Sequence, residues 1–248
     1  MALKDILSVP LYDVTCPSGK KLSFRPFLGK EEKLLLIAME SEDAKVVFDT
    51  VIKILQNCVG DISNVKVDTL PLFDIEYLFL NLRARSIGET VPLKYRCRST
   101  VQNTATQQAE TCGTISEYKV DLLSIKPAFG EGHTKYIALT DTVGVTLKYP
   151  AFKSFSKLAR KDLPAEEAFE FVLNCIESVS DANTITYAKD VSREELIDFV
   201  ESLSHQQIAK LDKFFQTMPK IESTVHFNCP KCGAKEDIVV SGLDNFFV

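Results

Sequence analysis

Several features that define special classes of protein are scarce in, or missing from, this sequence of 248 residues. Glycine and proline number only 10 each, which excludes collagen-like and low-complexity chains. No apolar run approaches the ~20 residues that a membrane-spanning helix needs. The first residues, MALKDILSVPLYD, carry charges within their apolar stretch. We therefore expect no secretory signal, no membrane partner, and a reducing compartment in which cysteines are thiols or metal ligands.

Positive charge is also in short supply. Acidic residues number 34 and basic residues 29, which leaves a net charge of -5 at pH 7. This balance argues against a large footprint on nucleic acid or on an anionic membrane. The hydrophobic fraction of 45% and the charged fraction of 25% are those of a folded globular chain of one large domain or two modest ones.

Recognisable catalytic motifs are missing as well. The three histidines, His133, His205 and His226, have no Gly-x-Ser-x-Gly nucleophile motif beside them. No glycine-rich phosphate loop precedes a Lys-Ser or Lys-Thr pair. Acidic pairs such as Glu31-Glu32 lie in the first turns of predicted helices, where they complement the helix dipole. We expect that the protein is not an enzyme and has no catalytic residues.

Apolar periodicity separates helices from strands along the chain. It predicts a hairpin over 11–27, helices over 29–60, 68–88, 152–161 and 164–179, strands over 89–97, 114–123, 134–140 and 144–150, a strand or extended link over 183–189, capped helices starting at Ser192 and Ser204, and a final pair of strands over 223–240. The polar segment 98–111 is expected to be an exposed loop. In the first hairpin and the arm after it, we expect Phe24 and Phe27 to be buried and Arg25 to stay at the surface.

The cysteines carry the most informative local pattern. Cys229 and Cys232 stand two residues apart in CPKCG, a turn whose two thiolates can bind one metal ion. Cys97 and Cys112 end extended runs and supply a second pair, so we predict a structural zinc-ribbon-like site of four cysteines. The spacer of 14 residues between Cys97 and Cys112 replaces the usual two to four. A redox pair or two free thiols in CPKCG are the alternatives.

The remaining cysteines and one histidine have simpler interpretations. Cys58 and Cys175 lie on apolar helix faces and are expected to be core thiols. Cys16 lies in a hairpin turn and is expected to be exposed. His226, three residues before Cys229, is interpreted as a strand-surface residue rather than a ligand.

These elements give an α+β fold, in which two helical clusters lie around a β-rich module with the zinc-ribbon-like four-cysteine site. The predicted divisions are 1–88 for a hairpin and helical cluster, 89–150 plus 218–248 for the metal-stapled module, and 151–217 for the second helical cluster. The apolar end Phe246-Phe247-Val248 either packs on its own domain or binds a partner. We take it as a candidate partner contact.

Two long segments also resemble a known family. SGKKLSFRPFLGKEEKLLLIAMES and LPLFDIEYLFLNLRARSIGE, together with the paired cysteine segments, resemble the baseplate hub assembly family of contractile-tailed bacteriophages of the T-even type. The resemblance implies a non-enzymatic virion morphogenesis protein, either a transient assembly factor or a lasting component. It further implies other baseplate hub proteins as partners, and the host cytoplasm or the tail baseplate as its location.

The residues alone, without the resemblance, are also compatible with two other functions. A zinc ribbon can serve a nucleic-acid-binding regulatory factor, although the acidic chain and the few aromatic residues of the ribbon argue against it. A thiol redox protein is the third possibility.

Overall fold

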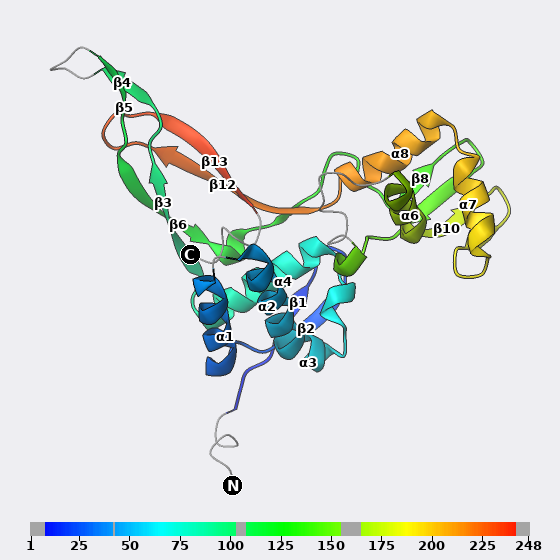
Figure 1. Ribbon diagram of the computed structural model, residues 1–248, viewed down its shortest axis with the longest axis horizontal. Coiled ribbons are helices and arrows are strands. Elements are labelled where there is room, and N and C mark those ends of the chain that lie inside the picture. Colours follow the sequence, from blue (N-terminus) through cyan, green and yellow to red (C-terminus); the bar gives the residue numbers. More distant parts are fainter. Residues whose placement is uncertain (1–7, 42, 103–107, 155–164, 242–248) are drawn as a thin grey trace, which may run out of the picture. The chain divides into compact units, whose positions relative to one another are not determined.

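The computed structural model describes residues 8–41, 43–102, 108–154 and 165–241, and Figure 1 shows their fold. The chain forms two compact units. The first unit takes in the described parts of Met1–Val65, Ile75–Pro127 and Ile221–Val248, and the second those of Lys66–Asp74 and Ala128–Lys220. Helices and strands fall largely in separate blocks, which confirms the predicted α+β class. No described helix combines the length and apolar character needed to cross a bilayer.

The first unit begins with a β-hairpin that is followed by helices. Its elements are β1 (Tyr12–Thr15), β2 (Lys21–Phe24), α1 (Gly29–Glu40), α2 (Ala44–Leu55), the π-helical turn η2 (Gln56–Gly60), α3 (Asp61–Ser63) and α4 (Leu72–Ser86), which enters this unit at Ile75. Ile54 of α2 and Phe79 of α4 are fully buried. The arm after the hairpin is fastened to α4, because Phe27 N donates a hydrogen bond to Ser86 Oγ at 2.8 Å.

The same arm contains a buried ion pair that the sequence did not reveal. Glu31, in the first turn of α1, is fully buried and accepts hydrogen bonds from Arg25 Nη2 and from Leu28 N, both at 2.9 Å. The expectation that Arg25 stays at the surface is wrong, since its side chain is 14% exposed and is drawn inward by this carboxylate. Phe24 is buried as predicted, whereas Phe27 is only half-buried.

Replacing Glu31 with glutamine should lower the free energy of unfolding by about 1–3 kcal/mol, because Arg25 loses its charged acceptor. Burial opposes the carboxylate charge, but the hydrogen bonds from Arg25 and Leu28 hold the pKa of Glu31 below its ordinary value of 4.5. A lowered pKa gives stabilisation that is complete above the unfolded value and is lost as pH falls through the folded value.

Urea unfolding at neutral pH and below pH 4 measures this contribution. The difference in the free energy of unfolding between the wild type and Glu31→Gln should be smaller at the acid pH. Glu32→Gln is the matched control, since Glu32 is exposed in the same helical turn. Equal losses for the two variants would contradict the role of the buried pair.

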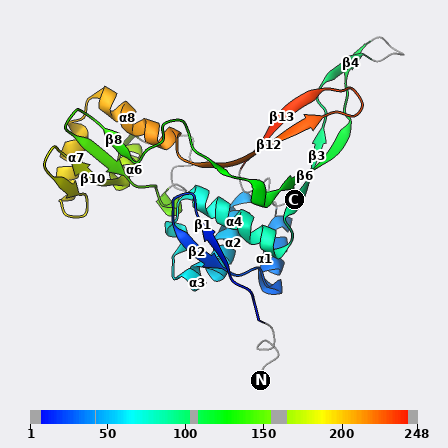
Figure 2. The same ribbon diagram turned by 180° about the vertical axis from the view of Figure 1, so that it is seen from behind.

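The rest of the first unit consists of antiparallel strands. They are β3 (Thr90–Arg96), β4 (Thr100–Gln102), β5 (Ala109–Thr111), β6 (Ile115–Asp121), β12 (Lys220–Asn228) and β13 (Lys235–Ser241), with the 3-10 turn η4 (Leu122–Ser124) after β6 and the short β7 (Pro127–Ala128) beside β12. β3 pairs with β6, and β12 pairs with β13. The hairpins β3–β6 and β12–β13 lie side by side, as Figures 1 and 2 show from opposite directions.

The polar segment 98–111, predicted as an exposed loop, contains a further hairpin. Thr100 pairs with Thr111, and Gln102 pairs with Ala109. The strand residues are exposed or half-buried, so the predicted exposure is confirmed and the predicted lack of regular structure is wrong. The threonines of this segment suit an extended backbone, whose polar groups are satisfied by the pairing.

The second unit combines a four-stranded antiparallel sheet with helices. The strand order is β11 (Ile185–Tyr187), β10 (Ile176–Ser180), β9 (Gly144–Leu147) and β8 (Tyr136–Ala138), and the unit also holds α6 (Ala165–Cys175), α7 (Arg193–Glu201), α8 (His205–Gln216) and the 3-10 turn η3 (Val67–Thr69). Its buried core, drawn from both the sheet and the helices, contains Leu139, Val145, Leu147, Leu173, Ile176, Leu196, Val200, Leu211 and Phe214. Ser192 and Ser204 cap α7 and α8, as the sequence predicted.

One sequence prediction in this unit is wrong. The helix predicted over 164–179 ends at Cys175, and Ile176 begins β10. Ile176 and Ser178 are buried while Glu177 between them is exposed, which is the alternation of a strand with one covered face, and β10 pairs with β9 and β11 on its two sides. β8 and β9 belong to this sheet, whereas the sequence grouped them with the cysteine-bearing strands. The division into three parts as a whole stays a prediction, and the helix predicted over 152–161 lies largely outside the described residues.

Candidate metal centre

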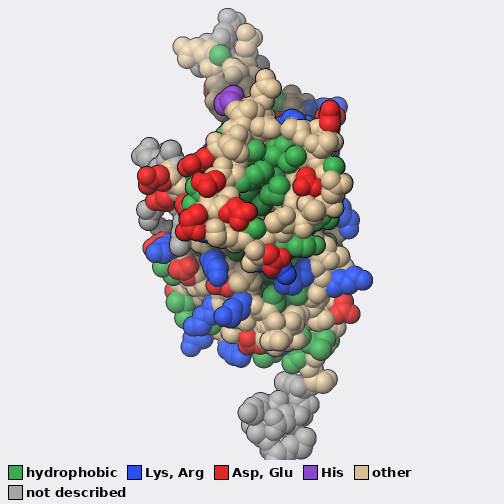
Figure 3. Space-filling model, turned by 90° about the vertical axis from the view of Figure 1, so that its right-hand side faces the viewer, with side chains coloured by type: hydrophobic (Ala, Val, Ile, Leu, Met, Phe, Trp, Pro, Cys, Tyr) green, Lys and Arg blue, Asp and Glu red, His purple; other side chains and the backbone are tan. Residues whose placement is uncertain are grey.

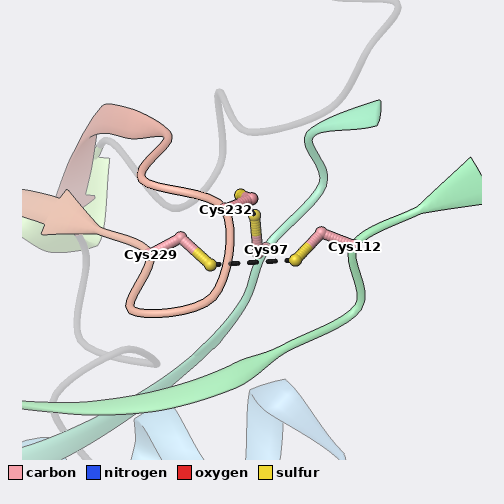
Figure 4. Close-up of side chains that lie close together, drawn as sticks. All are labelled: Cys97, Cys112, Cys229 and Cys232. Atoms are coloured by element: carbon pink, nitrogen blue, oxygen red, sulfur yellow. Dashed lines mark hydrogen bonds between the residues drawn. The ribbon is translucent and has the colours of Figure 1, made fainter. Parts of the chain in front are cut away.

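Four strand ends bring the predicted ligand cysteines together in the first unit. Cys97 follows β3, Cys112 follows β5, Cys229 follows β12, and Cys232 lies in the turn that leads to β13. Figure 4 shows the four side chains pointing toward one another from these strand ends. Residues that are more than a hundred positions apart in the sequence thus share one site, as the sequence predicted.

The sulfur atoms lie close enough together to share one metal ion. All four Sγ atoms lie within 4.8 Å of one another. Cys97 Sγ is 3.6 Å from Cys232 Sγ, and Cys112 Sγ is 3.8 Å from Cys229 Sγ. Four thiolates held at about 2.3 Å from a central ion would be about 3.8 Å apart. The four cysteines, of which only Cys232 is not buried, could therefore hold a metal ion.

The CPKCG segment forms a tight turn that is closed by its own backbone. Gly233 N donates to Cys229 O at 2.9 Å, and Cys229 N donates to Ala234 O at 2.8 Å. Gly233 has a φ of +71°, a left-handed conformation that glycine adopts without a steric penalty. The turn thereby directs both of its sulfurs to the same side.

The Cys97 and Cys112 half repeats this hydrogen-bond pattern. Gly113 N donates to Cys97 O at 3.1 Å, Cys97 N donates to Thr114 O at 2.8 Å, and Gly113 has a φ of +67°. Cys112 N also donates to Ser99 O at 2.8 Å, which closes the base of the β4–β5 hairpin. The long spacer is therefore a hairpin inserted into an ordinary cysteine turn, and it leaves the geometry of the two ligands unchanged.

Gly233→Ala should weaken the affinity for added Zn²⁺ about tenfold, because a left-handed conformation costs a residue with a Cβ about 1–2 kcal/mol. An added Cβ meets no atom within 4 Å, so backbone strain alone is tested. Gly29→Ala, at another open position but with ordinary φ, is the matched control and should not change the affinity. Equal affinities of both variants in a competition assay with a coloured chelator would show that the turn tolerates the strain.

An aromatic layer below the cysteines joins the two hairpins. Phe227 of β12 is 2% exposed, and its ring lies 4.6 Å from that of Tyr95 and 5.5 Å from that of Tyr118. Tyr95 donates to Glu236 Oε2 at 2.8 Å, and the Tyr118 hydroxyl donates to Asn228 O at 2.9 Å. Sequence reasoning missed these supporting residues, although each is an aromatic in a strand adjoining a ligand cysteine.

Hydrogen bonds around the sulfurs favour a thiolate. A hydrogen bond from the backbone N–H of Cys232 lowers the pKa of Cys229 to about 6. Desolvation acts in the opposite direction but is the smaller effect. The hydroxyl and N–H of Thr114 lower the pKa of Cys112. Although the Ala234 N–H acts in the same sense on Cys232, desolvation and the neighbouring thiols raise its pKa to about 12. The Cys229 thiolate therefore forms readily, whereas Cys232 needs a nearby cation before it loses its proton at neutral pH.

The other cysteines and His226 are not members of this cluster. Cys58 and Cys175 are buried core thiols, as predicted, and burial raises their pKa values to about 11 and about 12. Cys16 was expected to be exposed but is 2% exposed, because the turn between its N–H and Lys20 O folds the side chain inward. His226 is a surface residue as predicted and pairs with Asp237 at 2.7 Å. The predicted partner contact Phe246, Phe247 and Val248 lies outside the described residues.

Fold and site together define an α+β protein in which strands from the middle and the end of the chain meet at four cysteines able to hold a metal ion. The chain belongs to the T4 bacteriophage base plate protein family, whose model matches residues 9–248. It is 25% identical over 242 residues to the baseplate hub assembly protein gp26 of Enterobacteria phage T4, a match that covers 95% of this chain and 96% of that protein. The resemblance noted in the sequence is thereby confirmed. No solved structure matches the chain significantly.

Proposed function

We propose that this protein acts without catalysis in phage virion morphogenesis, where it helps to assemble the tail baseplate hub through contacts with other hub proteins. The observation that carries the proposal is the similarity to a baseplate hub assembly protein over nearly the full length of both chains. The proposed location is the host cytoplasm during assembly.

We further propose that the metal at Cys97, Cys112, Cys229 and Cys232 is a structural Zn²⁺. The donor set supports this choice, because four thiolates in a tetrahedron are a common ligand set of structural zinc and leave no coordination position open for water or a substrate. When bound, the ion would join the β3–β6 hairpin to the β12–β13 hairpin. The chain itself orients the sulfurs through its two glycine turns and covers one side of them with Phe227.

Partner binding is the second part of the proposal. Phe246, Phe247 and Val248 are proposed as one contact, on the strength of two adjacent aromatic residues in a terminal segment. Removing these residues should weaken binding to hub proteins in a pull-down from infected cells and leave the zinc content unchanged.

A phage that carries a stop codon in this reading frame tests the assembly role. The expected result is a loss of infectious particles together with unfinished hubs or baseplates in the lysate, and rescue by the gene supplied from a plasmid. A normal yield of virions would overturn the proposal. Mass spectrometry of purified virions then separates a lasting component from a factor that leaves. Salt-dependent binding of duplex DNA by the purified chain would favour the nucleic-acid alternative instead.

A further inference from the structure

An apolar groove lies beside α7 in the second unit. Its volume is about 200 Å³, and it opens to solvent at the β10–β11 end of the sheet. The apolar residues that line it are Val143, Val179, Ala188, Val191, Leu196 and Phe199. All of these except Leu196 are only partly covered by the rest of the chain. The packed core therefore stops short of this edge of the sheet and leaves apolar surface in contact with water.

The charged residues that line the groove are all acidic. They are Asp181 in the β10–β11 turn and Glu195 on α7, and no lysine, arginine or histidine is among the lining residues. Asp181 Oδ1 accepts hydrogen bonds from Asn183 N at 2.7 Å and from Thr184 N at 2.8 Å. These bonds lower the pKa of Asp181, so its carboxylate stays ionised.

Two further acidic residues lie beside the groove on α7, and the nearby Arg193 is paired with Glu170. Glu194 and Asp198, which flank Glu195 on α7, are exposed as well. Figure 3 views the molecule from the side on which α7 lies in Figure 1, and it shows an exposed apolar patch with acidic side chains around it. An apolar surface within a negative field favours an occupant that is itself apolar and positively charged.

The size of the groove indicates the kind of occupant. Pockets for small-molecule ligands usually have volumes of about 300–1,000 Å³. A groove of about 200 Å³ that is open to solvent is better matched to one or two large side chains of a protein segment. Anchors of this kind, buried at the centre of a contact, supply most of the energy of many interfaces.

We propose that this groove binds a partner protein through a segment in which a large apolar side chain is flanked by lysine or arginine. The apolar side chain would enter between Val179 and Phe199, and its basic neighbours would face Asp181 and Glu195. The chemistry follows from the groove alone, and only the naming of the partner as a baseplate protein rests on the proposed function.

Binding to immobilised peptides tests the proposal with the full-length, zinc-loaded chain. One peptide set covers the baseplate proteins of the phage that encodes the chain, as short overlapping segments. A second set has random sequences that combine leucine or phenylalanine with lysine or arginine, and a third replaces the basic residues by glutamate or aspartate. We expect binding to the basic-apolar peptides of the first two sets, binding that weakens as salt is added, and none to the acidic set.

Groove variants connect that binding to the site. Asp181→Asn combined with Glu195→Gln should weaken it about tenfold and remove most of its salt dependence. Asn keeps the oxygen that accepts from the turn, so this variant should fold. Ala188→Phe, which fills the groove, should abolish binding. Asp212→Asn removes one charge from the exposed face of α8 outside the groove and is the matched control.

Three results would overturn the proposal: no peptide bound, binding that the groove variants leave unchanged, or a dimer of the chain that Ala188→Phe dissociates, since a second copy would then be the occupant. Binding to random basic-apolar peptides without any baseplate peptide would support the groove chemistry and count against the baseplate role. A failure of the stop-codon test leaves the peptide results standing, so the two proposals fail separately.

Discussion

Removing the proposed zinc, or replacing Cys229 with serine, should unfold the cysteine-bearing strands while the second unit stays folded. Among the described residues, the buried core at this site consists of Cys97, Cys112, Phe227 and Cys229, with Tyr95, Tyr118 and a few other partly buried residues packed against it, so the apolar surface that holds the hairpins together without a metal is small. Binding at structural zinc sites supplies about 10–16 kcal/mol, which is folding free energy for the residues around the ion. The loss should therefore exceed that of any single core substitution.

Three measurements check this result. Metal analysis should give one equivalent of zinc per chain before chelation and none for Cys229→Ser. Limited proteolysis should cut within residues 98–111 only after the metal is removed, and circular dichroism should retain the helical signal. Cys58→Ala is the matched control, because it removes a buried thiol and should reduce stability without releasing metal. Full protection of the strands after chelation would contradict a structural role for the ion.

Replacing Phe214 with alanine should destabilise the second unit by about 3–5 kcal/mol. Phe214 is 1% exposed in the core of that unit. Its ring stacks on those of His133 at 5.2 Å and Tyr149 at 5.5 Å, and these two side chains are joined by a hydrogen bond between His133 Nε2 and the Tyr149 hydroxyl at 2.9 Å. The alanine would leave a cavity beside His133 and Tyr149. Because their mutual hydrogen bond holds these side chains in place, they cannot move to fill the cavity.

Thermal unfolding of the zinc-loaded chain measures the effect of this substitution. The transition of the second unit should move to lower temperature, and the zinc should stay bound until the first unit unfolds. Phe215→Ala makes the same change at the next position of α8, where the ring is half-buried, and should cost less. A loss below about 1 kcal/mol for Phe214→Ala, or zinc release in the same transition, would contradict separate cores in the two units.

The cluster of four cysteines could be predicted from the sequence because its signals are local. The CPKCG segment contains both of its cysteines and the glycine of the turn within five residues, and Cys112 is likewise followed by a glycine, Gly113. The hairpin between Cys97 and Cys112 could not be predicted from the sequence. Its strands carry no apolar alternation, and their pairing depends on the backbone hydrogen bond between Cys112 and Ser99 in the folded chain. The aromatic layer was missed for the same reason, since Tyr95 and Phe227 belong to strands far apart in the chain.

Other predictions were wrong where tertiary contacts outweighed local preference. Arg25 is a surface residue by its chemistry, but the buried carboxylate of Glu31 draws it inward. Cys16 lies in a turn, where exposure is usual, and yet its side chain points into the protein. Ile176 continues a helical pattern of apolar residues, and only the strands on either side of it decide that it begins β10.

The order of the ligands along the chain also sets the time at which the metal can bind. Cys97 and Cys112 leave the ribosome early, whereas Cys229 is made 117 residues after Cys112, with the whole of Ala128–Lys220 in between. The second unit can fold while synthesis continues, since domains that emerge first fold first. The complete site cannot form until the last strands have been made. A chain with the complete site has therefore been translated at least as far as Cys232, and chains that stop before Cys229 lack at least two of the four cysteines.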